Sequence, residues 1–234
     1  MTAAVELERP DVLTELGQQT LRELMRSWFD FERRLARAPI IRRLDSGDFS
    51  LDDYRRLLLN LRPQVVEGSR WISRCASSFD RDHADVRSMI IGHASDEHRD
   101  YELLESDYAA SGGELAEILA QPRNLGSEIL HSYLMYRASQ PNPVCLLGAM
   151  WIIEGLGEKM ARDWAVRIEE LTGSDGGNTQ FMRYHAANDD HHMGKLYALL
   201  DRVCTDRRSA AGIVKTSFAV GRLYAMQLEE IDNG

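Results

Sequence analysis

The sequence predicts an all-α protein built as one helical bundle. β-branched residues are sparse, and no run alternates apolar and polar residues with the period of two that marks a strand. Apolar residues recur instead at helical spacing along most of the chain. The connections between these stretches are short, with no linker long enough to separate domains. We therefore expect residues 1–234 to form a single domain, with residues 1–10 as a flexible N-terminus.

The N-terminal part predicts two long helices. The first covers about residues 12–37, and its apolar stripe consists of Leu13, Leu16, Leu21, Leu24, Trp28 and Phe31. Pro39 helps to stop it. Ser50 and Asp53 then form an S-x-x-D capping box, which predicts the start of the second helix. That helix should run to about residue 79, with a kink near Pro63.

The middle of the chain predicts three further helices. A third helix over about residues 84–110 ends at Gly112-Gly113, where the pattern stops. A short helix over 114–120 and another over 127–138 follow. Pro141-Asn142-Pro143 then interrupts any helix, because proline lacks the backbone donor and restricts the residue before it.

Three helices complete the prediction. A long apolar helix is expected over about residues 144–171. Asn178 or Thr179 can cap the next helix, which carries His185. The last helix covers about residues 208–231 and ends the chain.

Composition and charge exclude several functional classes. The net charge is −9 and the pI is about 5.3, which argues against a nucleic-acid or anionic-membrane surface. No apolar run approaches the roughly 20 residues that a membrane helix needs. The first ten residues lack the apolar core of a secretory signal. Three widely spaced cysteines favour a reduced compartment, so a cytoplasmic location is expected.

The residues with the strongest chemical signal are His185, Asp189 and His192, which stand at i, i+4 and i+7. On an α-helix these side chains fall within roughly 60° of arc. Two imidazoles and a carboxylate on one stripe can converge on one divalent metal ion. The spacing therefore predicts a metal-binding helix.

A second stripe repeats this spacing with His93, Glu97 and Asp100. Glu154 adds a carboxylate within the apolar run 150–157, where burial is costly unless the acid is paired or bound to metal. One such stripe is also typical of a solvated helix face. Two stripes together with Glu154 favour a metal centre clamped between helices.

Aromatic residues and glycines lie close to these candidates in sequence. Trp151, Tyr184 and Tyr101 are compatible either with a substrate pocket or with core packing, and packing is the commoner role. Gly155 and Gly157 inside a helix cost roughly 1 kcal/mol each relative to Ala. Such glycines predict a close approach by another helix or by a ligand.

At these residues the chain resembles the heme-oxygenase-like di-iron oxidases and oxygenases, whose superfamily includes thiaminase II and pyrroloquinoline quinone synthase. The resemblance rests on segment 96–104 followed by Ser111-Gly112-Gly113, on segment 151–155, and on the His185-x3-Asp189-x2-His192 motif. It covers about residues 50–203. It implies a bundle of seven to eight helices. It also implies two iron ions, held by Glu97, Glu154, His185, Asp189 and His192.

The chain departs from the family pattern at one position. The family has a His shortly after the residue that matches Glu97, and Asp100 stands there in this sequence. His93, one turn before Glu97, is one replacement for the missing imidazole, and direct ligation by Asp100 is the other. Two iron ions are expected, and a single iron is the alternative if this side of the site stays incomplete.

The resemblance implies an O2-dependent non-heme di-iron oxidase or oxygenase. It would act on an unidentified small molecule with an external electron donor, and carboxylates such as Glu154 would bridge the irons and take part in catalysis. One alternative is a metal-independent enzyme like thiaminase II or the quinone synthase, with Glu154 as the base. Another is a non-catalytic helical scaffold. A haem role is disfavoured because residues 12–37 contain no His. A homodimer is a hypothesis from the compact helical class.

Overall fold

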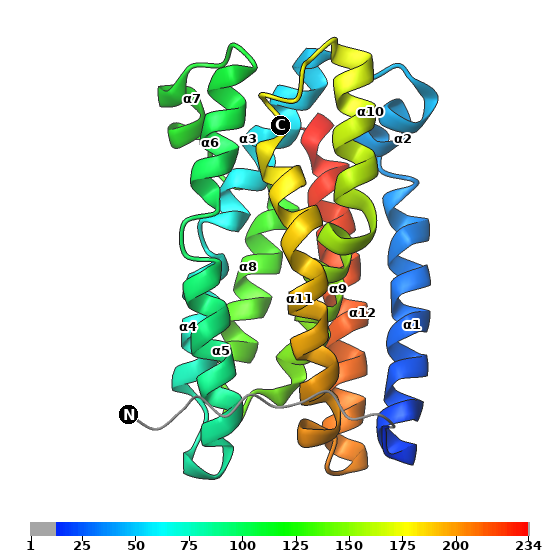
Figure 1. The fold of residues 1–234 in the computed structure, drawn as a ribbon, viewed down its shortest axis with the longest axis vertical. Helices are drawn as coiled ribbons and strands as arrows, with labels where there is room; N and C mark the ends of the chain where they lie inside the picture. The colour runs from blue at the N-terminus through cyan, green and yellow to red at the C-terminus, as the bar shows by residue number, and fades with distance from the viewer. Residues whose placement is uncertain (1–12, 234) are drawn as a thin grey trace.

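The computed structural model describes residues 13–233, apart from the side chains of residues 188–192. Every regular element in this part of the chain is a helix, and most helices run along the long axis of the molecule (Figure 1). The first six α-helices are α1 (Glu15–Leu35), α2 (Pro39–Ser46), α3 (Leu51–Val65), α4 (Gly68–Ser77), α5 (Ala84–Asp96) and α6 (Tyr101–Ala110). The next six are α7 (Leu115–Ala120), α8 (Leu125–Ala138), α9 (Leu147–Leu156), α10 (Arg162–Thr172), α11 (Gln180–Val203) and α12 (Arg207–Glu229).

Helix α12 forms the middle of the bundle and packs against α1, α8 and α9. Its inward face buries Ile213, Val220 and Leu228 completely or nearly so. The contact with α9 is close, because a Cβ atom added to Gly148 would lie only 2.1 Å from the Ile213 carbonyl oxygen. Apolar burial of this extent is the main stabilising term of such a bundle. The predicted all-α helical class is confirmed.

The N-terminal helices contain one element that the sequence analysis missed. Helix α1 ends at Leu35, and Pro39 occupies the first position of α2 instead of simply stopping α1. Proline fits this position because its missing N–H would have no partner there and its φ is already helical. Gly47 ends α2 with a φ of 87°, in the left-handed region that favours glycine.

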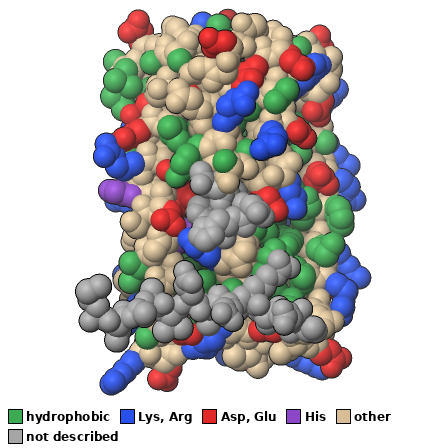
Figure 2. Space-filling view, in the orientation of Figure 1, with side chains coloured by type: hydrophobic (Ala, Val, Ile, Leu, Met, Phe, Trp, Pro, Cys, Tyr) green, Lys and Arg blue, Asp and Glu red, His purple; other side chains and the backbone are tan. Residues whose placement is uncertain are grey.

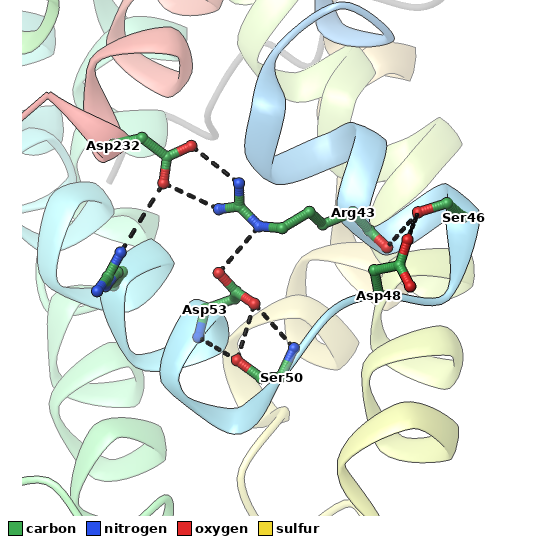
Figure 3. Close-up of polar contacts among 7 residues, drawn as sticks. Arg43, Ser46, Asp48, Ser50, Asp53 and Asp232 are labelled. Atoms are coloured by element: carbon green, nitrogen blue, oxygen red, sulfur yellow. Dashed lines mark hydrogen bonds and ion pairs between the residues drawn. The ribbon is translucent and has the colours of Figure 1, made fainter.

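The predicted capping box at the start of α3 is confirmed. Asp53 N donates to Ser50 Oγ at 3.2 Å, and Ser50 N donates to Asp53 Oδ2 at 2.9 Å. Figure 3 shows how this cap joins an ion-pair cluster, in which Arg43 contacts both Asp53 and Asp232. The cluster ties α2, α3 and the C-terminal turn together.

The expected single helix from Ser50 to Phe79 is two helices. Helix α3 ends at Val65 and α4 begins at Gly68, while Pro63 lies inside α3. The chain therefore breaks just after the proline rather than kinking at it. This break lies near the middle of the long axis (Figure 1).

The prediction of one helix over residues 84–110 is also wrong in one respect. Helix α5 ends at Asp96, Glu97 is its C-cap, and Asp100 is the N-cap of α6. A turn therefore separates Glu97 from Asp100, and the i, i+4, i+7 stripe does not lie on one continuous helix. Both helix ends nevertheless lie at mid-height beside α11 (Figure 1).

The expected helix over residues 144–171 is divided as well. A 3-10 turn (Val144–Leu146) precedes α9, and a π-helical segment (Gly157–Ala161) joins α9 to α10. π-Helical turns are rare and are frequent at functional sites. Here the segment begins three residues after Glu154.

The remaining helix predictions agree closely with α7, α8, α11 and α12, and Thr179 is the N-cap of α11. Residues 1–10 lie outside the described residues, and the single-domain organisation stays a prediction. No helix in the described part of the chain is long and apolar enough to cross a membrane. On the face seen in Figure 2, acidic and basic side chains are interspersed, so no basic patch gathers there.

Candidate metal centre

Five of the seven predicted ligands come together near the middle of the bundle. His93 lies on α5, Glu154 on α9 and His185 on α11, while Glu97 and Asp100 flank the turn between α5 and α6. These elements are far apart in sequence, so only the tertiary fold could bring their side chains together. Two groups of three ligand atoms result.

The first group consists of His93, Glu97 and Glu154. One ligand atom from each lies within 4.8 Å of the other two, and His93 Nε2 is 3.2 Å from Glu154 Oε1. His93 is 1% exposed and Glu154 is 5% exposed. This buried side of the site is walled off from solvent.

The second group consists of Glu97, Asp100 and His185. Their ligand atoms also lie within 4.8 Å of one another, and His185 Nε2 is 3.5 Å from Asp100 Oδ2. Asp100 is buried and His185 is half-buried. Both His93 and Asp100, which the sequence left as alternatives, therefore lie beside Glu97, one in each group.

Glu97 is the only described residue common to the two groups. The sequence analysis expected Glu154 to bridge two metals; among the described residues Glu154 belongs to the first group, and its bridging role stays a prediction. A carboxylate has two oxygens and can bind one ion with each. Among the described residues, Glu97 is therefore the carboxylate that lies in both ligand groups.

Asp189 and His192 belong to the same sequence motif as His185. Their backbone lies in α11, but their side chains fall outside the described residues. The positions follow His185 by four and seven residues on the same helix. Their roles stay predictions.

Burial and charge together perturb the central acid. Burial, reinforced by the neighbouring charge of Glu154, raises the pKa of Glu97 to about 7. The imidazoles of His185 and His93 act in the opposite direction but do not cancel these effects. Such a strongly perturbed acid in a cluster of ionisable groups is typical of a functional site.

The donor set fits a divalent transition metal. Carboxylate oxygens and imidazole nitrogens are the donors of di-iron carboxylate bundles. Metal–ligand bonds of roughly 2.0–2.2 Å place ligand atoms about 3–4 Å apart around one ion. Separations within 4.8 Å require only small side-chain adjustments to reach that geometry. The residues present therefore fit a divalent metal ion.

Helix α11 is held against α5 and α6 by polar contacts at several points along its length. Asp107 on α6 accepts from Gln180 N at 3.0 Å and Phe181 N at 2.9 Å, which caps the N-terminus of α11. Lys195 donates to Asp96 at 3.0 Å, one residue before Glu97. These contacts fix the position and rotation of the helix that carries His185.

Aromatic neighbours orient the His185 ring. The Phe181 ring lies one turn earlier with its centroid 4.4 Å from that of His185, and the Tyr184 ring meets it edge-on at 5.5 Å. Both are T-shaped contacts, which favour one ring orientation. His185 Nε2 thereby remains close to Asp100.

A cavity of about 100 Å³ lies directly beside the acid cluster and is lined in part by Glu97, Glu154 and His185. Most of its wall is apolar. The aliphatic and aromatic residues that line it include Leu57, Leu61, Val65, Trp71, Ile72, Ile153, Leu156, Trp164, Phe181 and Leu228. The cavity can hold a small molecule against the proposed ligands.

The aromatic residues singled out from the sequence do not line this cavity. Trp151 is buried and meets Tyr197 edge-on, so it packs in the core. Tyr184 is 40% exposed. The close approach expected at Gly155 is confirmed, because a Cβ atom there would lie 3.0 Å from Trp28 Cζ3 on α1.

Sequence reasoning missed Asp107, although a signal was present. Leu104, Asp107 and Tyr108 share one face of α6, so the carboxylate stands on an apolar stripe. Asp107 is completely buried, and burial raises its pKa to about 6 against the effect of the two backbone donors. An acidic residue on the apolar face of a helix indicates a capping residue or a site residue.

Comparison with known proteins supports the fold. No protein-family model and no curated protein sequence matches this chain. A crystal structure from Shewanella denitrificans, described as a domain of unknown function with a heme oxygenase-like fold, matches with a TM-score of 0.85 at 17% identity and covers 92% of each chain.

Two TenA homologues are also similar. The Pseudomonas syringae protein matches with a TM-score of 0.76 at 14% identity, over 97% of this chain and 99% of its own. The one from P. horikoshii matches with a TM-score of 0.67 at 13% identity, over 91% and 97%. At these identities the likeness concerns the fold alone. The chain has a heme-oxygenase-like all-α fold.

Proposed function

We propose that this protein is an O2-dependent non-heme di-iron oxidase or oxygenase that acts on a small molecule. The observation that carries the proposal is the pair of ligand groups that share Glu97. One group offers His93 and Glu154, and the other offers Asp100 and His185. Asp189 and His192 are proposed to complete the ligand set from α11.

Bound iron would supply the redox chemistry with O2 and electrons from an external donor. The chain's own residues would bind the ions and position the substrate. Glu97 would bridge the two ions, and His93 and His185 would serve as terminal ligands on opposite groups. The apolar wall of the cavity excludes water and holds the substrate beside Glu154.

Iron analysis after anaerobic Fe(II) loading tests this proposal. We expect two iron ions per chain in the wild-type protein and one or none in His185→Ala. His83→Ala is the matched control, because His83 lies in a 3-10 turn and pairs with Asp80 away from the cluster. Absence of uptake, or equal uptake in both variants, contradicts the proposal.

A metal-independent enzyme of the thiaminase II kind is the second candidate. The likeness to two TenA homologues favours it. Glu154 would act as the base, and His93 at 3.2 Å would stabilise its charged form. Hydrolysis of thiamine that is undiminished in excess chelator and lost in Glu154→Gln would support this candidate over the di-iron enzyme.

A further inference from the structure

A second, smaller cavity lies next to the cavity beside the acid cluster. Its volume is about 20 Å³, and α4, α5, α9 and α11 all contribute side chains to its wall. Trp71 and Ile72 on α4 line both cavities. The two cavities therefore adjoin at this pair of side chains. Neither residue belongs to the two ligand groups.

The smaller cavity also lies close to two of the proposed metal ligands. Ile90 lines it from α5, three residues before His93, and Met150 lines it from α9, four residues before Glu154. One turn of an α-helix rises by about 5.4 Å. Both ligands are buried, so a reactant for a metal ion at this group must pass through the protein interior.

The wall of the smaller cavity is apolar. Among the described side chains that line it, only Trp71 and Cys75 carry a hydrogen-bonding group, and the thiol is a weak one. A buried water typically makes about three hydrogen bonds, which these side chains do not supply. Apolar cavities stay dry and take up apolar molecules. A volume of about 20 Å³ exceeds the roughly 10–15 Å³ that one water-sized molecule needs, so a diatomic gas is the class of ligand that suits it.

The loop that precedes α9 supplies Pro143 and Val144 to this wall, and hydrogen bonds hold that loop in place. Asn142 N donates to the Ser78 carbonyl at 3.1 Å, and Asp80 N donates to Asn142 Oδ1 at 2.9 Å. Asn142 has a φ of 46°, in the left-handed region that asparagine adopts more readily than most residues. These bonds tie the loop to the segment that follows α4 and fix this part of the wall.

We propose that the smaller cavity is a binding site for molecular oxygen, from which O2 enters the larger cavity past Trp71 and Ile72. O2 is apolar and dissolves better in apolar media than in water, so it gains from transfer to this wall. The inference rests on the proposed function, because it assigns a source of O2 to that site. The binding step itself requires the cavity and does not require the metal.

Methyl NMR of the full-length, metal-free protein under O2 pressure tests the binding step. O2 is paramagnetic and speeds the relaxation of nuclei close to it. Leu199 lines the smaller cavity and Leu44 lines neither cavity, yet each is 1% exposed. We expect O2 to increase the relaxation rate of the Leu199 methyl groups at least about threefold more than that of the Leu44 methyl groups.

A substitution that fills the cavity assigns the effect to it. Val203→Ile adds one methyl group to the wall from α11, and protein interiors are packed closely enough for one such group to matter. In this variant the O2 effect on Leu199 should fall to that on Leu44. Val166→Ile is the matched control, because it adds the same group to an exposed residue of α10. It should keep the wild-type difference.

Stopped-flow oxidation of the Fe(II)-loaded protein tests delivery of O2. In Val203→Ile the rate constant for oxidation by O2 should fall at least about threefold, because the filled cavity no longer holds O2 beside the site. Oxidation by ferricyanide, an anion too large for either cavity, should proceed at the wild-type rate. A slower reaction with both oxidants would indicate a damaged metal centre and contradict delivery through this cavity.

Three outcomes overturn the inference: equal O2 effects on Leu199 and Leu44 in the wild-type protein, a difference that survives in Val203→Ile, or oxidation by O2 that is equally fast in that variant. The first needs no variant, so a folding defect cannot obscure it. The O2 effect on Leu199 without iron uptake would leave the binding site standing and contradict the di-iron proposal. Iron uptake without the O2 effect would do the reverse.

Discussion

Two clusters of charged side chains hold this bundle together, and they are built differently. The first lies at mid-height and gathers Glu97, Asp100 and Glu154 with two imidazoles. The second lies near the end of the bundle where α2, α3 and the C-terminal turn meet (Figures 1 and 3), and there Arg43 contacts Asp53 and Asp232.

The pKa values of Asp53 and Glu97 reflect this difference between the two clusters. Burial of Asp53 alone would raise its pKa, but hydrogen bonds from Ser50 and the charge of Arg43 bring it below the ordinary value. For Glu97, burial is reinforced by the charge of Glu154. A cluster that serves structure balances its charges with a guanidinium. A cluster with excess carboxylate is suited to a cation that binds from outside the chain.

The sharpest test of this contrast removes one carboxylate from each cluster. Glu97→Gln should lower Fe(II) affinity by more than about tenfold and abolish binding of two ions together, because the shared ligand is lost. Asp53→Asn should leave iron binding unchanged. Anaerobic Fe(II) titration compares the two variants, and equal effects would remove the distinction between the clusters.

Metal addition should also separate the clusters by thermal stability. A cation that binds only the folded chain stabilises it by about 2.7 kcal/mol at a free concentration 100 times its Kd. We expect Fe(II), under anaerobic conditions, to raise the Tm of wild type and of Asp53→Asn by several degrees. Glu97→Gln should respond little. A Tm of the wild-type protein that does not depend on metal concentration would contradict the account.

Two helix caps, Asp107 and Asp53, should respond oppositely to pH. The pKa of Asp107 is raised by burial, so its contribution to the free energy of unfolding is lost as pH rises from about 4 to about 6. Relative to wild type, Asp107→Asn should therefore gain roughly 2 kcal/mol over that interval in the metal-free protein.

The contribution of Asp53 has the opposite sign. Its pKa is lowered, so that contribution is present above the ordinary pKa and is lost as pH falls below it. Asp53→Asn should therefore lose stability relative to wild type as pH rises through about 4. Urea unfolding at a series of pH values measures how the free energy of unfolding of each variant, relative to wild type, changes with pH. Changes of the same sign in the two variants would contradict the opposite pKa shifts of Asp107 and Asp53.

The smallest effect is expected from the structural cluster itself. Arg43→Met should destabilise the protein by about 1 kcal/mol, because its ion pairs are partly exposed. The loss should shrink at high salt. Iron binding should not change. A change in iron stoichiometry in this variant would mean that the two clusters are coupled.

Much of the fold could be predicted from local sequence, and the reasons are specific. The Ser50–Asp53 capping box and the apolar stripe of α1 are local signals, and both elements form where expected. The sequence analysis did not predict where the chain breaks within a continuous helical pattern. Residues 97–100 continue a helical pattern, yet tertiary packing of α5 and α6 against α11 turns the chain there.

The candidate site shows the same division between features that local sequence predicts and features that depend on the tertiary fold. The residue types and spacings of His93, Glu97, Asp100 and His185 were sufficient to nominate them, and the structure brings them together. Which carboxylate is shared was not predictable, because it depends on how α9 and α11 meet the α5–α6 turn. Asp107 acts through contacts across the fold, which spacing along the chain does not encode.

The most direct test is a crystal structure of the protein loaded anaerobically with Fe(II), with the metal located by its anomalous scattering. We expect two iron ions, with one oxygen of Glu97 bound to each at roughly 2.0–2.2 Å. A single ion, or two ions that Glu97 does not join, would contradict the central claim that this residue links the two ligand groups.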